Sequence, residues 1–193
     1  MTNFYISDTH FNYANILKHD NRPFNSTEEM EETIVSNWNS VIGKGDMVYI
    51  LGDFCWSKEE SEWIRILDKL NGLKTLVLGN HDKSKMSATL KSKFADIKEY
   101  KETTDNGRKV IMCHYPILLH KKAYDKDCYM LCGHVHTTKE DVFLEKWRKE
   151  LQDNCSERGD ARGNIINVGC MKEYMNYTPR TLDELIKVLE NEY

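Results

Sequence analysis

The sequence lacks the features that mark membrane-spanning, disordered or disulfide-stapled proteins. Its longest apolar runs have about five residues, whereas a membrane helix needs about 20. It has only 3 prolines among 193 residues, which argues against long disordered or collagen-like stretches. Its 6 cysteines form no C-x-x-C pair, so we expect reduced thiols rather than a zinc ribbon. No basic segment followed by an apolar run opens the chain, so we expect a cytoplasmic protein without a signal peptide.

A surplus of positive charge is also missing. The chain has 27 Lys and Arg against 31 Asp and Glu, which gives a formal net charge of -4. This balance argues against a protein whose whole surface grips nucleic acid or an anionic membrane. A local positive site remains possible, because a bound metal adds charge that the sequence does not count. The length is typical of one domain, and we predict a single domain over residues 1–193.

Short apolar segments of strand length recur along the chain, and most of them end in polar residues. They cover residues 4–6, 47–51, 75–78, 110–113, 129–132 and 165–168. Continuous apolar runs of this kind are typical of strands that are buried on both faces in a layered protein. Helical patterns lie between them, and this alternation predicts an α/β fold.

Three helices are predicted by capping-box patterns, in which a Ser or Thr is followed three residues later by Glu. The boxes begin at Ser26, Ser57 and Thr181. A fourth, charged helix is predicted over residues 139–152, with Phe143 and Trp147 on its apolar face. Trp38, Trp63 and Trp147 all lie on helical apolar stripes, so we expect them to pack in the core.

Residue types that bind metals follow several of the predicted strands. They are Asp8 and His10, Asp53, Asn80 with His81 and Asp82, His114, and His134 with His136. In open sheets, ligands collect at the carboxyl ends of the strands, so these side chains could converge on one crevice. Oxygen and imidazole donors without thiolate suit divalent ions such as Mn, Fe, Zn or Co.

The motifs D-x-H, G-D, G-N-H-D, a single H and G-H-x-H, in this order, resemble those of the calcineurin-like metallophosphoesterase family. The resemblance runs from residue 4 to about residue 170. It implies a four-layer αββα sandwich, in which two mixed sheets are flanked by helices, and a site for two divalent ions. Manganese is the first choice, with Fe, Zn, Co or Ni as alternatives. The resemblance assigns Asp8, His10 and His136 to one ion, Asn80, His114 and His134 to the other, and Asp53 to both.

The same resemblance implies a two-metal phosphoric ester hydrolase in which a hydroxide that bridges the ions attacks phosphorus. His81 matches the residue near the leaving group and could protonate it, and Asp82 could orient either His81 or the loop. We expect a small or nucleotide-like phosphate ester as substrate, with phosphodiesterase and phosphatase activity both open. A nuclease for DNA or RNA is the main alternative, but no run of Lys or Arg longer than two residues is present to build a basic groove. An inactive scaffold is less favoured, because every matching position is filled.

Two regions could shape the choice of substrate. In the segment after the first metal motif, four side chains could contact a substrate: Asn12, Tyr13, Asn15 and Arg22. The second region is the stretch 137–163, which we expect to form either a cap over the site or a solvated surface excursion. If it is a cap, Arg158 or Arg162 would lie near phosphate.

Overall fold

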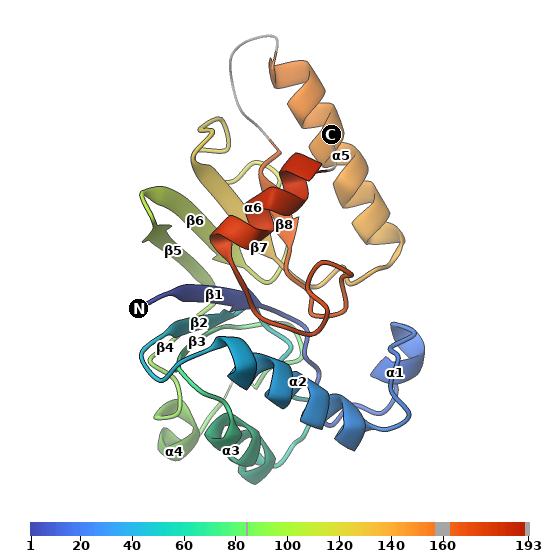
Figure 1. Cartoon of the computed structure of the whole chain (residues 1–193), viewed down its shortest axis with the longest axis vertical. Helices are drawn as coiled ribbons and strands as arrows, with labels where there is room; N and C mark the ends of the chain where they lie inside the picture. Colours follow the sequence, from blue (N-terminus) through green and yellow to red (C-terminus); the bar gives the residue numbers. More distant parts are fainter. Residues whose placement is uncertain (84, 157–162, 192–193) are drawn as a thin grey trace.

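Two β-sheets form the centre of the computed structural model, which describes residues 1–83, 85–156 and 163–191 (Figure 1). The first sheet contains β1 (Asn3–Ile6), β2 (Met47–Ile50), β3 (Leu73–Val77), β4 (Asp96–Lys98) and β9 (Arg180–Thr181), in the order β4-β3-β2-β1-β9. The second contains β5 (Tyr100–Asp105), β6 (Arg108–Cys113), β7 (Cys128–Cys132) and β8 (Ile165–Asn167), in that order. Strands β9 and β5 run antiparallel to their neighbours and the other pairs are parallel, so both sheets are mixed.

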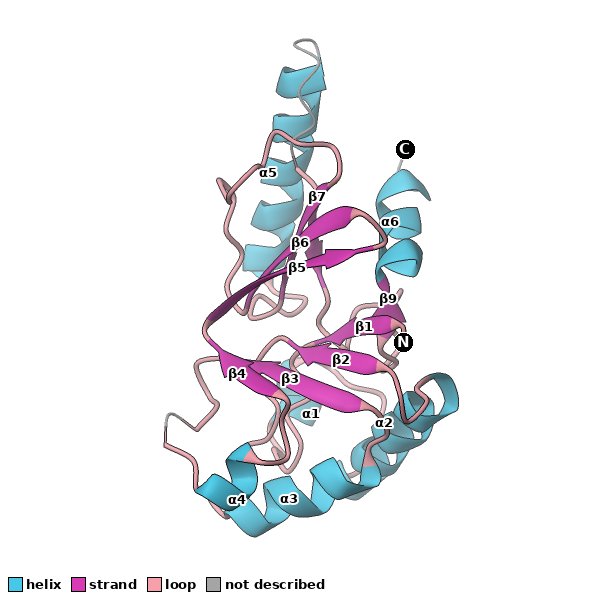
Figure 2. Cartoon of the chain, turned by 90° about the vertical axis from the view of Figure 1, so that its left-hand side faces the viewer, coloured by secondary structure: helices cyan, strands magenta, loops and turns pink. Residues whose placement is uncertain are grey.

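Helices flank the two sheets (Figure 2). The first sheet is covered by α2 (Thr27–Val41), α3 (Glu60–Lys69) and the short α4 (Ala88–Lys91), whereas α5 (Lys139–Ser156) and α6 (Leu182–Asn191) lie beside the second. The short α1 (Ile16–His19) lies in the connection after β1. This helix–sheet–sheet–helix arrangement confirms the predicted four-layer sandwich. Among the described residues, no helix is long and apolar enough to cross a membrane.

The inner strands are mostly apolar because each lies between the other sheet and a helical layer. Tyr5, Ile6, Val48 and Ile50 are buried in β1 and β2, within one large core. The apolar-run pattern missed β4 and β5, which lie at sheet edges and are largely polar. The parallel strands β1, β2 and β3 end at the same edge of their sheet, and the loops that follow them hold Asp8, His10, Asp53 and Asn80. The candidate histidines 114, 134 and 136 follow β6 and β7 of the second sheet.

Two of the three capping boxes start helices as predicted. The boxes at Ser26 and Thr181 begin α2 and α6, and at Thr181 the Glu184 carboxylate accepts the backbone N–H of Thr181 at 2.8 Å. The helix predicted after Ser57 is present as α3, but Ser57 does not cap it. Ser57 Oγ accepts the backbone N–H of Glu59 at 3.1 Å, which makes a turn, and α3 begins after that turn.

Helix α5 lies in the stretch 137–163 and is longer than predicted. Its Leu144 is buried. Phe143 and Trp147, however, are 66% and 44% exposed, so the expectation that Trp147 packs in the core is wrong. Trp38 and Trp63 are fully buried, as predicted. The charged helix therefore leaves part of its apolar face uncovered.

Candidate metal centre

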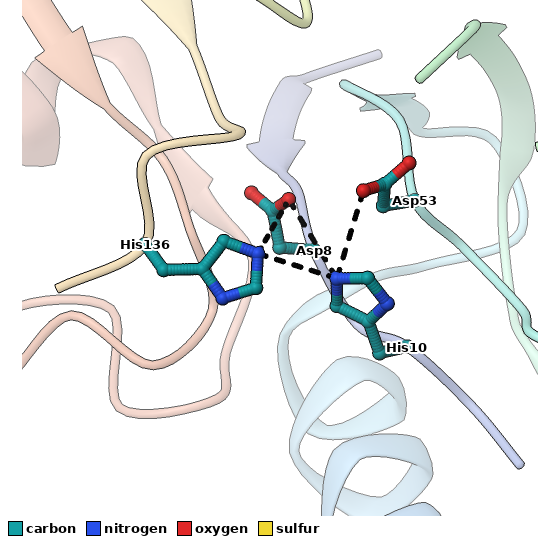
Figure 3. Close-up of side chains that lie close together, drawn as sticks. All are labelled: Asp8, His10, Asp53 and His136. Atoms are coloured by element: carbon teal, nitrogen blue, oxygen red, sulfur yellow. Dashed lines mark hydrogen bonds and ion pairs between the residues drawn. The ribbon is translucent and has the colours of Figure 1, made fainter. Parts of the chain in front are cut away.

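Four of the predicted ligands converge from the loops after β1, β2 and β7 (Figure 3). Asp8, His10, Asp53 and His136 each offer one ligand atom, and these atoms all lie within 4.8 Å of one another. His10 Nε2 is 3.3 Å from His136 Nε2, which is 3.4 Å from Asp8 Oδ1. Two carboxylates and two imidazoles without thiolate form a donor set that suits divalent ions such as Mn, Fe, Zn or Co.

The other three predicted ligands extend this cluster past Asp53. Asn80 Oδ1 lies 2.9 Å from both His114 Nε2 and His134 Nδ1. Asp53 Oδ2 is 3.7 Å from His10 Nε2 and 3.5 Å from His114 Nε2. One carboxylate oxygen therefore faces both halves of the cluster: the first half, with Asp8, His10 and His136, and the second half, with Asn80, His114 and His134. The residues thus fit the two-ion assignment that the sequence motifs imply, which stays a prediction.

The backbone of the candidate ligands has an uncommon conformation. Five of them have φ between 47° and 69°: Asp8, His10, Asp53, His134 and His136. This left-handed region is rare for residues other than glycine, although Asp and His adopt it more often than most. It turns the chain sharply where a strand ends, and it persists only when surrounding contacts hold it.

Asp53 is held so that one of its oxygens stays free for an ion. Its Oδ1 accepts the backbone N–H of His81 at 2.9 Å, whereas Oδ2 faces His10 and His114. Gly79 passes so close to this carboxylate that a Cβ at residue 79 would overlap Asp53 Oδ1. The glycine of the Gly79-Asn80 turn is therefore required for close approach of the two loops.

Asp82 joins the loops after β2 and β3. Its carboxylate accepts the backbone N–H groups of Asp53, Phe54 and Gly79 at 2.8 to 2.9 Å. Burial raises the pKa of Asp82 to about 6, although these hydrogen bonds oppose the shift. We therefore assign Asp82 to holding the ligand-bearing loops, which is the second of the two roles expected for it from the sequence.

Backbone and side-chain partners also fix the imidazole rings of His114 and His136. His114 Nδ1 lies 2.8 Å from the carbonyl oxygen of Leu51, so this nitrogen carries the proton and Nε2 is left for an ion. Burial lowers the pKa of His114, but the hydrogen bond to Asp53 and the nearby charges raise it to about 8. Burial likewise opposes a charge on His136, yet its carboxylate partners raise the pKa to about 10. The neighbouring carboxylates thus favour positive charge on these two rings.

Asp20 is a site residue that the sequence motifs did not reveal. Its Oδ1 lies 2.7 Å from His136 Nδ1, and the other nitrogen of that ring faces Asp8. Arg22 holds Asp20 at 2.8 Å and also donates to the backbone carbonyls of Asp8 and Thr9, at 2.8 and 3.0 Å. The Arg22 side chain is fully buried. Arg22 thus holds the backbone of the first metal motif from the buried side, which corrects the prediction that it contacts substrate.

The aromatic rings of Tyr13 and Trp56 pack beside the first half of the cluster. Tyr13 stacks on Trp56, with ring centroids 3.9 Å apart, and Trp56 lies 4.4 Å from the ring of His81. His81 is exposed, and its ring centroid is 5.9 Å from that of His10. Of the predicted substrate residues, Tyr13 therefore lies at the site: its ring centroid is 5.8 Å from that of His10, and it stacks on the tryptophan that contacts His81.

The remaining predicted substrate residues do not gather at the cluster or cannot be placed. Asn12 donates to Glu62 of α3 at 3.2 Å. Asn15 is exposed at the start of α1. Arg158 and Arg162 lie outside the described residues. The predicted contact between an arginine of the 137–163 stretch and phosphate therefore stays a prediction.

Known proteins resemble this chain in sequence and in fold. A family model described as the calcineurin-like phosphoesterase superfamily domain matches residues 1–182. An uncharacterized protein of Methanocaldococcus jannaschii is 37% identical over 188 residues, which is 96% of this chain and 89% of that protein. The Gene 66 protein of Mycobacterium phage L5 is 35% identical over 81 residues, 40% of this chain and 38% of that protein. A crystal structure of a protein of unknown function from Aquifex aeolicus has a TM-score of 0.69 and 28% identity, and the match covers 97% of this chain and 98% of that one.

Proposed function

The chain belongs to the calcineurin-like phosphoesterase superfamily, and we propose that it hydrolyses a small or nucleotide-like phosphate ester at the cluster around Asp53. The family supports metal-dependent phosphoesterase activity in general. The observation that supports this site is the position of Asp53 Oδ2, which lies 3.7 Å from His10 Nε2 and 3.5 Å from His114 Nε2. Two bound divalent ions, manganese in our proposal, would activate water at neutral pH and stabilise charge on the phosphoryl oxygens.

The chain's own residues bind, orient and transfer protons. Asp20 and the Leu51 carbonyl fix the rings of His136 and His114, so each ring keeps its other nitrogen toward the cluster. His81 is exposed beside this cluster and its ring packs against Trp56. In this position its imidazole can give a proton to the leaving oxygen, a role worth about 10²–10⁴-fold in rate.

Turnover by the purified, manganese-loaded protein tests the proposal. We expect release of p-nitrophenol from bis-p-nitrophenyl phosphate, p-nitrophenyl phosphate or both. The control is Asp53→Asn, which loses the carboxylate shared by the two halves and should lose turnover and metal together. If the wild type holds metal but turns over neither ester, the proposal fails and a binding scaffold is favoured.

A further inference from the structure

An apolar groove opens beside the metal centre, on the side of His134. Its volume is about 350 Å³, and six apolar residues line it: Pro116, Leu118, Val135, Phe143, Leu144 and Trp147. His134 and Glu140 complete the lining. The groove therefore lies between α5 and the segments that follow β6 and β7, within the range of volumes typical of ligand sites.

Helix α5 leaves large apolar side chains uncovered at this groove. Phe143 and Trp147 are 66% and 44% exposed, whereas Leu144 of the same helix packs into the core beside the second sheet. Exposed apolar surface that is grouped beside polar residues marks a binding site more often than isolated apolar residues do. Contact with an apolar group would remove this surface from water, which is favourable.

The groove and the metal centre share His134. Its Nδ1 is 2.9 Å from Asn80 Oδ1, while its ring packs against Tyr115 with centroids 4.6 Å apart. The same residue also lines the groove. A phosphate ester at the cluster can therefore extend one organic substituent past His134 and into the groove.

Charge restricts what can occupy the groove. Among the residues that line it, Glu140 is the one carboxylate, and none is Lys or Arg. A second phosphate or a carboxylate would therefore be repelled and would find no cation. The lining favours an uncharged group of aryl or nucleobase size.

The position of His81 indicates which substituent this is. His81 lies against Trp56 and His10, in the half of the cluster that Asp8 and His136 share. His134 lies in the other half, with Asn80 and His114. If His81 protonates the leaving oxygen, as in the proposed function, the leaving group lies toward His81. The group beside His134 is then the one that stays on phosphorus.

We propose that the substrate is a phosphodiester whose retained substituent, an uncharged aromatic group, binds in the groove between α5 and residues 116–118. This inference rests on the proposed function. The oxygen of water bonds to phosphorus, the bond from phosphorus to the leaving oxygen breaks, and the leaving alcohol takes its proton from His81. One proton of the water stays on the product phosphate, and the other replaces the proton that His81 gave. The product in the groove is the phosphate monoester of the retained group.

Two diesters with the same leaving group test this assignment. They are phenyl p-nitrophenyl phosphate and methyl p-nitrophenyl phosphate, both of which release the more acidic p-nitrophenol. We expect the manganese-loaded wild type to prefer the phenyl ester by roughly tenfold in kcat/KM. Trp147→Ala and Phe143→Ala should each remove most of this preference, while kcat/KM for the methyl ester stays within about twofold.

Val142→Ala is the matched control. Val142 is 69% exposed on the same helix and does not line the groove, so its truncation should leave the preference unchanged. Circular dichroism and thermal unfolding of all three variants show whether α5 still folds. Because the two groove residues are also exposed, we expect unfolding temperatures close to that of the wild type.

Several outcomes would overturn the assignment. One is the absence of a phenyl preference in the wild type or its persistence in both groove variants. Another is an equal loss for both esters, which would put the leaving group in the groove. A third is a wild-type dimer, seen by analytical ultracentrifugation and lost in both groove variants, because a second copy would then be the occupant. If the metal-loaded wild type hydrolyses no ester at all, the proposed function itself fails. That result can be told apart from a failure of the groove assignment, in which esters are still hydrolysed.

Discussion

The carboxylate of Asp20 should control metal affinity even though it faces away from the ions' expected position. Its Oδ1 accepts from His136 Nδ1 at 2.7 Å, and the Asp20 side chain is 3% exposed. Such a partner fixes the tautomer and the orientation of a ligating imidazole, and its loss typically costs about 10–100-fold in metal affinity. We expect about a tenfold loss in Asp20→Asn, which keeps an acceptor oxygen but not the charge. Asp20→Ala removes both and should lose about a hundredfold.

The same substitutions also remove the negative charge that pairs with the buried guanidinium of Arg22. Its guanidinium donates to Asp20 at 2.8 Å and, independently, to the carbonyls of Asp8 and Thr9. Removing one partner of a buried ion pair costs about 3–5 kcal/mol, because the other charge is left uncompensated. The two carbonyls remain, so we expect Asp20→Ala to lie at the lower end, about 3 kcal/mol less stable to unfolding. Asp20→Asn should lose about 1 kcal/mol.

Calorimetric titration of Mn²⁺ into chelator-treated protein measures the affinity, and urea unfolding without metal measures the stability. Asp96→Asn is the control: it breaks the ion pairs of Asp96 on the edge strand β4 with Lys98 of the same strand and Lys101 of β5, and it should leave metal affinity unchanged. If both Asp20 variants stay folded and bind Mn²⁺ within about twofold of the wild type, the contact with His136 does not tune the site, and the reasoning is refuted.

Three further substitutions separate chemistry from loop geometry. His81→Ala should keep its metal and lower kcat by about 10²–10⁴-fold on esters with poor leaving groups; loss of metal in this variant would contradict the assigned role. Asp82→Asn cannot satisfy all three backbone N–H groups, so urea unfolding should show a loss of about 1–3 kcal/mol, and unchanged stability would argue against that role. Gly79→Ala should displace the Asp53 carboxylate and abolish tight Mn²⁺ binding with the fold retained, whereas Gly45→Ala, which has open space around it, should behave as wild type. Wild-type affinity in Gly79→Ala would show that the loops can separate without loss of the site.

The candidate ligands could be predicted because each motif ties a residue type to the end of a strand. Parallel strands end at one edge of their sheet, and here the ligand-bearing edges of both sheets meet, so that residues after β1, β2 and β7 form one cluster. Asp20 carries no such information. It is 116 residues from His136 in sequence, and their contact depends on how the connection after β1 folds against the loop after β7. From its place after the first metal motif, the neighbouring Arg22 is expected to contact substrate, because the sequence does not show that its guanidinium is buried.

The two tryptophans of α3 and α5 show a second limit of sequence patterns. Trp63 and Trp147 both lie on apolar helical stripes, yet Trp63 is fully buried and Trp147 is 44% exposed. Periodicity states which side chains share a face, but it does not state whether neighbouring elements are wide enough to cover that face. The edge strands β4 and β5 were missed for a related reason, because partly exposed strands lack the continuous apolar runs that identify the central ones.

The free-energy cost of the strained backbone at the site explains why residues that bind no ion affect its stability. Five candidate ligands adopt φ between 47° and 69°, and at about 1 kcal/mol each the total is about 5 kcal/mol. That is a large part of the 5–15 kcal/mol typical of whole domains. Glycine would remove the cost, but it has no side chain to bind an ion. The bonds from Asp82 to two loops and from Arg22 to the first metal motif therefore have to offset it. Because the same bonds hold the loops and place the ligands, their loss should lower stability and metal affinity together.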